Sequence, residues 1–141
     1  AIEVVADVRS RPHSRFAPQF NREALTRLLA DHGIRYLFLG RELGGKPPEL
    51  EKSLADEVVW RYLRSRPQFQ EGLARLLQEA RQARLALLCA EAEPGRCHRG
   101  LLLAPELEGL GAQVLHILAD GRVVGHASLN LAAPPAQKRL F

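Results

Sequence analysis

The feature that most constrains the fold of this chain is an alternation of short apolar runs with longer segments of helical periodicity. The apolar runs predict buried strands at residues 2–8, 34–39, 85–89 and 114–118. The helical segments that separate or follow them are residues 21–33, 54–64, 69–77 and 97–111. Strands that alternate with helices in this way build a parallel sheet with helical crossovers. We therefore predict an α/β protein with a three-layer, doubly wound fold: a mostly parallel sheet of about four to five strands with helices on both faces.

Turn and cap residues place several of the boundaries. Asn21 is a suitable helix cap, and Gly33 and Gly111 are suitable helix ends. Asp120-Gly121 predicts a tight turn, after which Val123-Val124 returns as a short strand. These signals give the chain a regular succession of elements up to about residue 125.

The chain has the size of one domain. Its 141 residues suffice for one sizeable core, and we expect a single α/β domain over residues 1–131 and an irregular tail over 132–141. No apolar run approaches the roughly 20 residues that cross a bilayer, and the start has no signal-peptide pattern. We expect a cytoplasmic protein with no membrane partner.

The basic residues are mostly arginine. Three of the 20 are lysine, which leaves 20 − 3 = 17 arginines, and the net charge is +4. Arginine matches phosphate and carboxylate groups in two contacts. Codon bias in a GC-rich genome explains the same composition, so the positions of individual arginines matter more than their number.

Polar residues gather where the predicted strands end. Asp7, Arg9 and Ser10 follow the first strand, a glycine- and proline-rich segment at residues 40–48 follows the second, and Glu91 follows the third. In open α/β sheets, ligands bind outside the carboxyl ends of the strands. The sequence therefore predicts a site at this edge of the sheet.

The segment after the third strand carries the strongest chemical signal. Cys97, His98 and Arg99 stand at the start of a predicted helix, where free N–H groups attract anions and favour a thiolate. His98 can act as acid or base, because its reference pKa is about 6.5. We take Glu91, His98 and Cys97 as candidate catalytic residues and Arg99 as an anion ligand. The alternative is that these side chains only cap or solvate the helix.

The segment after the first strand admits two interpretations. Asp7 is a candidate catalytic or orienting carboxylate, with Arg9, Ser10 and Arg15 as ligand-binding residues. Alternatively, Asp7 and Arg9 form an ion pair that orders the loop.

Two further parts of the predicted site are weaker signals. Gly44 and Gly45 let the backbone approach a ligand, but their segment matches no Walker or dinucleotide fingerprint, so we expect no cofactor. His116, in the fourth strand, completes the set of candidate ligand-binding residues.

A metal site is not expected. Cys89, Cys97, His98 and His116 are zinc ligands by type, but their spacing matches no common zinc module. Cys89 lies in a strand and is expected to be a core residue that points away from Cys97. Two cysteines in a chain of this length are expected to be thiols or ligands rather than a disulfide scaffold.

A series of motifs resembles the uncharacterised family called domain of unknown function 488. The motifs are Asp7-Val8-Arg9-Ser10 with Pro12 and Ser14, Phe20-Asn21-Arg22, Tyr36 with Leu39-Gly40, Leu43-Gly44-Gly45, Cys89-Ala90-Glu91 with Pro94, Cys97-His98-Arg99, and His116-Ile117-Leu118. The resemblance covers residues 2–120 and implies the fold and the shared polar positions, but no reaction. Members of the family usually begin with one more strand and helix, so we expect this sequence to be either a truncated or a shortened member. An unpaired sheet edge would then favour self-association into a homo-oligomer or pairing with another chain.

Three functions remain open from the sequence. The first is an enzyme, a hydrolase or transferase, that acts on a phosphorylated or nucleotide-like ligand and thus on an anionic small molecule. The second is a non-catalytic module that binds nucleic acid or nucleotides, with Phe16 and Phe20 interleaved among arginines. The third is a protein-interaction or regulatory protein.

Overall fold

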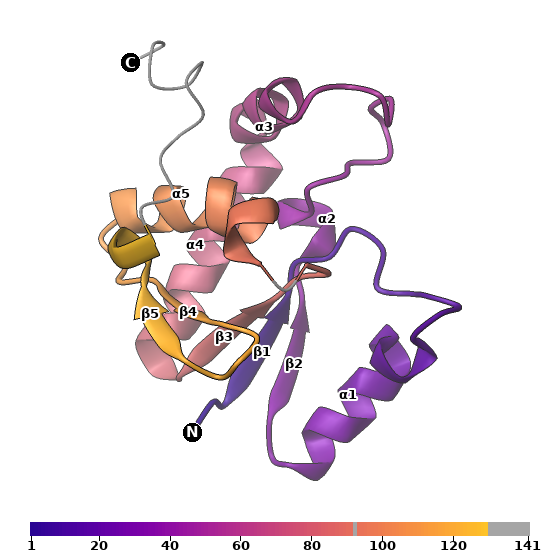
Figure 1. Cartoon of the computed structure of the whole chain (residues 1–141), viewed down its shortest axis with the longest axis vertical. Coiled ribbons are helices and arrows are strands. Elements are labelled where there is room, and N and C mark those ends of the chain that lie inside the picture. The colour runs from indigo at the N-terminus through magenta and orange to yellow at the C-terminus, as the bar shows by residue number, and fades with distance from the viewer. Residues whose placement is uncertain (92, 130–141) are drawn as a thin grey trace.

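A three-stranded parallel sheet lies at the centre of the structure, which is a computed structural model that describes residues 1–91 and 93–129. Strand β1 (Val4–Asp7) lies between β2 (Arg35–Phe38) and β3 (Leu85–Leu88), so the order is β2-β1-β3. All three run in the same direction and end at one edge, as Figure 1 shows. The α/β class and the first three predicted strands are confirmed.

The helices form most of the remaining chain. The α-helices are α1 (Arg22–Asp31), α2 (Gly40–Leu43), α3 (Asp56–Ser65), α4 (Pro67–Gln82) and α5 (Ala104–Gly109). A π-helix, η3 (Arg99–Leu103), leads directly into α5, and short 3₁₀ turns are η1 (Pro18–Phe20), η2 (Pro94–Arg96) and η4 (His126–Leu129). Among the described residues, no helix has the length and apolar character needed to span a bilayer.

The two faces of the sheet differ in character. The parallel register places Ala6, Leu37 and Leu87 on one face of the sheet. Ala6 belongs to the main core, and the two leucines pack against it. The opposite face carries Asp7 with Phe38, over which the Arg22 guanidinium of α1 lies 4.3 Å from the ring centroid. One face is therefore apolar, whereas the other includes a buried charge.

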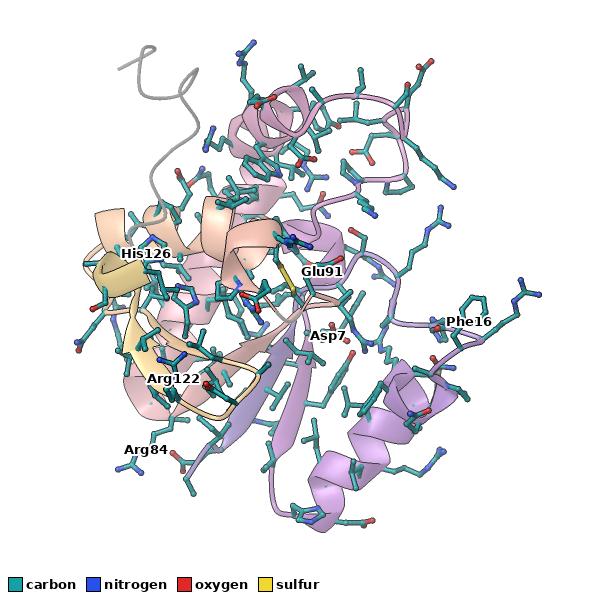
Figure 2. All side chains as sticks on the ribbon, in the orientation of Figure 1. Asp7, Phe16, Arg84, Glu91, Arg122 and His126 are labelled. Atoms are coloured by element: carbon teal, nitrogen blue, oxygen red, sulfur yellow. A yellow bond between two sulfur atoms is a disulfide. The ribbon has the colours of Figure 1, made fainter. Side chains whose placement is uncertain are left out.

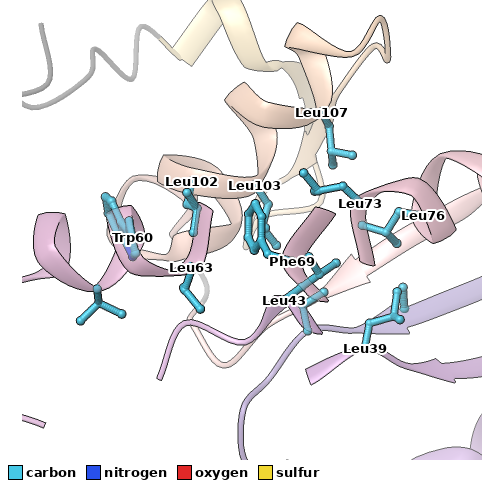
Figure 3. Close-up of a cluster of buried hydrophobic side chains, with 13 residues drawn as sticks. Leu39, Leu43, Trp60, Leu63, Phe69, Leu73, Leu76, Leu102, Leu103 and Leu107 are labelled. Carbon is cyan, nitrogen blue, oxygen red and sulfur yellow. The ribbon is translucent and has the colours of Figure 1, made fainter. Parts of the chain in front are cut away.

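Helices α2 to α5 and η3 supply most of the core. Its fully buried members include Phe69, Leu63, Leu73 and Leu102 (Figure 3). Helix α4 packs closely against α2 at Gly72, where an added Cβ would lie 2.7 Å from the Glu42 side chain. The short helix α2 replaces the start of the loop that we expected after the second strand.

The fourth predicted strand does not join the parallel sheet. Strand β4 (Leu115–Ile117) pairs antiparallel with β5 (Val123–Gly125) in a separate hairpin. The short connection, with Gly121 at φ 89°, permits only an antiparallel return. The predicted turn and fifth strand are confirmed, but the prediction that the fourth strand extends the parallel sheet is wrong.

Several predicted boundaries are confirmed. Gly33 has φ 73° after α1, and Gly111 has φ 97° after α5, which explains both glycines. Asn21 occupies the N-cap position of α1, but its side chain does not cap the helix. Its Oδ1 instead accepts a 2.6 Å hydrogen bond from Ser14 N–H across the loop. The predicted tail at 132–141 lies outside the described residues.

Candidate functional site

A cavity of about 480 Å³ lies outside the carboxyl ends of β1 and β3, and we call it the strand-end cavity. It is lined by Arg9, Ser10, Arg11, Gly45, Lys46, Asp56, Trp60, Cys89, Ala90, Glu91, Arg96, Cys97 and His98. Four of these side chains are cationic and two are carboxylates, so the lining has a net charge of 4 − 2 = +2 with histidine neutral. This position in the fold is the one predicted for the site.

Asp7 lies beneath this cavity and holds Arg9 in place. The Asp7 carboxylate is fully buried and accepts hydrogen bonds from Arg9 Nε at 2.9 Å and Arg9 Nη2 at 2.8 Å. It also accepts bonds from the backbone N–H of Arg9 and from the hydroxyl of Tyr36. The hydrogen bond from Arg9 to Asp7 raises the pKa of Arg9, and burial raises the pKa of Tyr36. Asp7 therefore positions Arg9 and does not itself line the cavity.

The glycine-rich segment closes against the first strand end. Ser10 Oγ accepts a 2.8 Å hydrogen bond from the backbone N–H of Lys46. Gly44 is buried beside the same hydroxyl, and a Cβ at Gly44 would overlap Ser10 Oγ and the Gly40 carbonyl oxygen. Glycine is needed at position 44 because the backbone passes close to the Gly40 carbonyl and to Ser10. Gly44 therefore lies behind the cavity wall, whereas Gly45 lines the cavity.

His98 packs against the glycine segment. A Cβ at Gly45 would lie 2.9 Å from Cγ and 3.1 Å from Nδ1 of the His98 ring. Burial lowers the pKa of His98. Hydrogen bonding to nearby backbone groups raises this pKa but only partly offsets the effect of burial. Its Nε2 is buried and has no hydrogen-bond partner among the described residues. The ring is therefore neutral near neutral pH and can accept a proton.

The loop after β3 is closed by a disulfide between Cys89 and Cys97, which is visible beside Glu91 in Figure 2. This pairing corrects two predictions: that the cysteines are thiols or ligands, and that Cys89 points away from Cys97. Cys89 lies one residue beyond β3, and the 3₁₀ turn η2 brings the chain back so that the two sulfurs meet. In this state Cys97 has no thiol to act as a nucleophile.

Glu91 is exposed at the mouth of the cavity. Its backbone N–H donates a 3.3 Å hydrogen bond to Cys89 Sγ, and the residue lines the cavity, as Arg96 does. Arg96 lies at the end of η2, on the same loop. The loop therefore brings one carboxylate and one guanidinium to the same cavity.

Arg99 and His116 line a different cavity. This second space, of about 380 Å³, lies along the outer edge of β3 against the β4–β5 hairpin, and we call it the edge cavity. It is mostly apolar, with lining residues that include Leu85, Leu107 and Ile117. The sequence did not separate Arg99 from His98, because the two are adjacent in the chain.

Two histidines meet beside the edge cavity. His116 Nε2 lies 2.9 Å from Nδ1 of His126, which belongs to η4, and His116 is buried. Burial lowers the pKa of His116, and His126 and Arg99 lower it further. His116 is therefore neutral near neutral pH.

Arg15 lies apart from both cavities. It is exposed in the loop after β1, next to Phe16, whose side chain is 93% exposed. In Figure 2, Phe16 projects outward from this loop, well away from Glu91.

The described residues contain no group of three or more His, Cys, Asp or Glu side chains that would hold a metal ion. The four residues with zinc-ligand chemistry are divided between the disulfide and the two cavities.

Sequence reasoning missed five charged or aromatic lining residues of the strand-end cavity: Arg11, Lys46, Asp56, Trp60 and Arg96. It also missed Tyr36 as a partner of Asp7. The parallel pairing of β1 with β2 was the available signal for Tyr36, because Tyr36 pairs with Val5, two residues before Asp7 and therefore on the same face. Asp56 and Trp60 lie on α3, where periodicity marks the buried side of the helix but not the cavity that it meets. Arg11, Lys46 and Arg96 lie on loops and a short turn, for which periodicity gives no spatial information.

Comparison with known proteins gives one match. The family model described as domain of unknown function DUF488 matches residues 1–104, a range that includes β1 to β3 and the lining residues of the strand-end cavity. No curated protein and no solved structure matches the chain at a significant level.

Proposed function

Since this chain belongs to the DUF488 family, whose description assigns no reaction, we propose a function from the strand-end cavity itself. The proposed function is that of an enzyme, a hydrolase or transferase, that acts on a phosphorylated or nucleotide-like ligand. The ligand's anionic group would lie against Arg9, at the carboxyl end of β1.

The observation that carries this proposal is the fixed orientation of Arg9. Two of its nitrogens bind a fully buried carboxylate, and its side chain is only 13% exposed. A guanidinium has five N–H donors, so Arg9 can bind a phosphate oxygen while it keeps both bonds to Asp7. A cation that is already oriented loses little conformational entropy when it binds a ligand.

The other cations strengthen the attraction for an anion. Arg11, Lys46 and Arg96 are exposed at the rim, and the carboxylates among the described lining residues are Asp56 and Glu91. The net positive lining favours a ligand with two or more negative charges, such as a phosphomonoester. Arg96 here takes the role that the sequence suggested for Arg99.

His98 and Glu91 are the candidates for proton transfer. A buried neutral imidazole can accept a proton from an attacking water or hydroxyl group as the bond to phosphorus or carbon forms. Glu91, exposed at the mouth, could exchange protons with solvent. In this scheme Asp7 positions Arg9 and does not take part in proton transfer.

The proposal is tested by thermal unfolding against a panel of nucleotides, phosphosugars and inorganic phosphate. A ligand at 100 times its dissociation constant stabilises the fold by about 2.7 kcal/mol, a visible shift for a domain of this size. We expect Lys46→Gln and Arg96→Gln to weaken binding of the ligand, because each removes a positive charge from the cavity lining. Both residues are exposed, so the variants should keep the core intact. Arg27→Gln, an exposed arginine on α1, is the matched control and should leave the hit unchanged.

Turnover separates an enzyme from a binding protein. With a ligand in hand, Glu91→Gln and His98→Asn should each reduce product formation while the thermal shift persists. If the panel gives no hit on folded protein, the anion-binding proposal is wrong; if a hit gives no product, only the catalytic part is wrong.

The exposed Phe16 favours one second candidate, the binding of single-stranded nucleic acid. Phe16 is 93% exposed and Phe20 is 52% exposed, on a loop that also carries Arg11 and Arg15. Aromatic side chains among arginines can stack on bases while the cations meet the phosphates. Binding to a short labelled oligonucleotide should then weaken with Phe16→Ala and fall steeply with salt. Affinity that is indifferent to both changes would remove this candidate.

A further inference from the structure

The two cysteines suggest a chemistry that the proposed reaction does not use. Cys89 and Cys97 are joined in the wall of the strand-end cavity, and both line it. Their surroundings differ: Cys97 is buried at 4% exposure, whereas Cys89 is only partly buried. An incoming reagent in the cavity therefore reaches the sulfur of Cys89 more easily than that of Cys97.

Cys97 is the sulfur better able to leave as a thiolate. Its Sγ accepts a 3.3 Å hydrogen bond from the backbone N–H of Arg99, in the first turn of η3. Nδ1 of His98 lies 3.8 Å from the same atom and can donate to a thiolate. Cationic side chains, Arg9 and Arg96, line the same cavity. Hydrogen bonds and positive charge stabilise a thiolate, and a stabilised thiolate leaves faster in disulfide exchange.

We propose that Cys89 and Cys97 form a thiol–disulfide exchange site that reacts with small thiols of the glutathione class, with attack at Cys89 and release of Cys97. The inference concerns the two sulfurs alone and does not depend on a phosphorylated ligand. It adds a redox reaction to a site for which no cofactor is expected.

The reaction balances in two steps. The thiolate of the first small thiol attacks Cys89 Sγ, a new sulfur–sulfur bond forms there, and the Cys89–Cys97 bond breaks with its electron pair on Cys97 Sγ. A second small thiolate then attacks the small-thiol sulfur of this mixed disulfide and releases Cys89 as a thiolate. The protein disulfide is reduced by two electrons, two small thiols are oxidised to their disulfide, and the protein thiolates take up protons from water.

The test uses the whole chain in buffers of reduced and oxidised glutathione, with acid quenching, alkylation of free thiols and peptide mass spectrometry. We expect the pair to pass fully between disulfide and dithiol as the glutathione ratio is varied. The trapped mixed disulfide should be on Cys89. Fluorescence of Trp60, the single tryptophan, reports whether the protein stays folded throughout, because its side chain is 4% exposed.

Single-cysteine variants test the asymmetry. At a pH where both thiols are ionised, oxidised glutathione should modify Cys89 in Cys97→Ser roughly 10-fold faster than it modifies Cys97 in Cys89→Ser, because Cys97 is buried and a stabilised thiolate is the weaker nucleophile. If either variant fails to fold, the position of the mixed disulfide in the unmodified chain still decides the direction of attack.

Three outcomes would overturn the proposal. The first is a folded protein whose cysteines stay as thiols in excess oxidised glutathione. The second is a folded protein whose disulfide resists excess reduced glutathione, which would make it purely structural. The third is a mixed disulfide found on Cys97.

Discussion

Replacement of Asp7 by asparagine tests the central structural argument. The carboxylate of Asp7 is fully buried and accepts four hydrogen bonds, three from Arg9 and one from Tyr36. Asparagine has nearly the same volume but carries no charge and can accept fewer of these bonds. Arg9, whose side chain is only 13% exposed, would keep its charge without its partner.

The expected cost is large because the pair is buried. Removal of one member of a buried ion pair typically costs about 3–5 kcal/mol, since the other charge is left uncompensated. For a domain of this size, 1 kcal/mol shifts the melting temperature by about 3–4 °C, so we expect Asp7→Asn to lower it by roughly 10 °C or more. Urea unfolding followed by Trp60 fluorescence gives the free energy directly.

The chain contains a matched control for this substitution. Asp120 and Arg122 have the same Asp-x-Arg spacing, and the Arg122 backbone N–H and Nε also donate to the carboxylate, at 3.0 and 2.7 Å. This second pair lies on an exposed turn, with side chains 56% and 69% exposed. Because exposed ion pairs contribute little, Asp120→Asn should be nearly neutral.

A double-mutant cycle with Arg9→Gln isolates the interaction. If Asp7 and Arg9 act as a unit, the double variant should be much more stable than the sum of the single losses implies. Additivity within about 0.5 kcal/mol, or a cost for Asp7→Asn no larger than that for Asp120→Asn, would refute the view that the buried carboxylate holds Arg9 in place.

Three further predictions concern packing and pH. Gly100→Ala should cost about 1–3 kcal/mol in urea unfolding, because the added Cβ would overlap the backbone of the 3₁₀ turn η2, whereas Gly109→Ala, with open space at its Cβ, should cost nothing. Phe69→Ala should cost about 3–5 kcal/mol in the same assay, since the ring is fully buried; a loss below 1 kcal/mol would contradict its place in the core. The pKa values of His98 and His116 are lowered by burial, so their contribution to stability is present above the unfolded pKa of about 6.5 and is lost as the pH falls from there through the folded pKa values. Urea midpoints should therefore fall between pH 7.5 and 5, and less so in His98→Asn; a midpoint that rises on acidification would show that the sign is wrong.

Much of the fold follows from local patterns in the sequence. The apolar runs that became β1, β2 and β3 are short and bounded by charged or glycine residues, so their positions were clear from periodicity. Gly33 and Gly111 marked helix ends because each needs a positive φ. Once the strands are parallel, the residues that follow them meet at one edge, which is why the strand-end cavity could be located.

The pairing of distant or irregular segments could not be predicted in the same way. The run at 114–118 has the composition of a buried strand, yet Leu115 and Ile117 are more than half exposed. Only the position of its partner β5, eight residues further along the chain, decides that it forms a hairpin. The meeting of Cys89 and Cys97 likewise depends on the turn η2, which has no periodic signal.

The separation of His98 from Arg99 shows how far adjacency in a sequence can serve as a guide to a site. Consecutive residues of a helix point in different directions, because the backbone turns about the helix axis from one residue to the next. At the start of η3, this rotation sends His98 to the strand-end cavity and Arg99 to the edge cavity, although both belong to one motif. The backbone N–H of Arg99 nevertheless bonds to Cys97 Sγ, so the main chain of this residue serves one cavity and its side chain serves the other. A substitution of the Arg99 side chain should therefore leave anion binding at Arg9 intact, and the residues to change in a search for ligands are Arg9, Lys46 and Arg96.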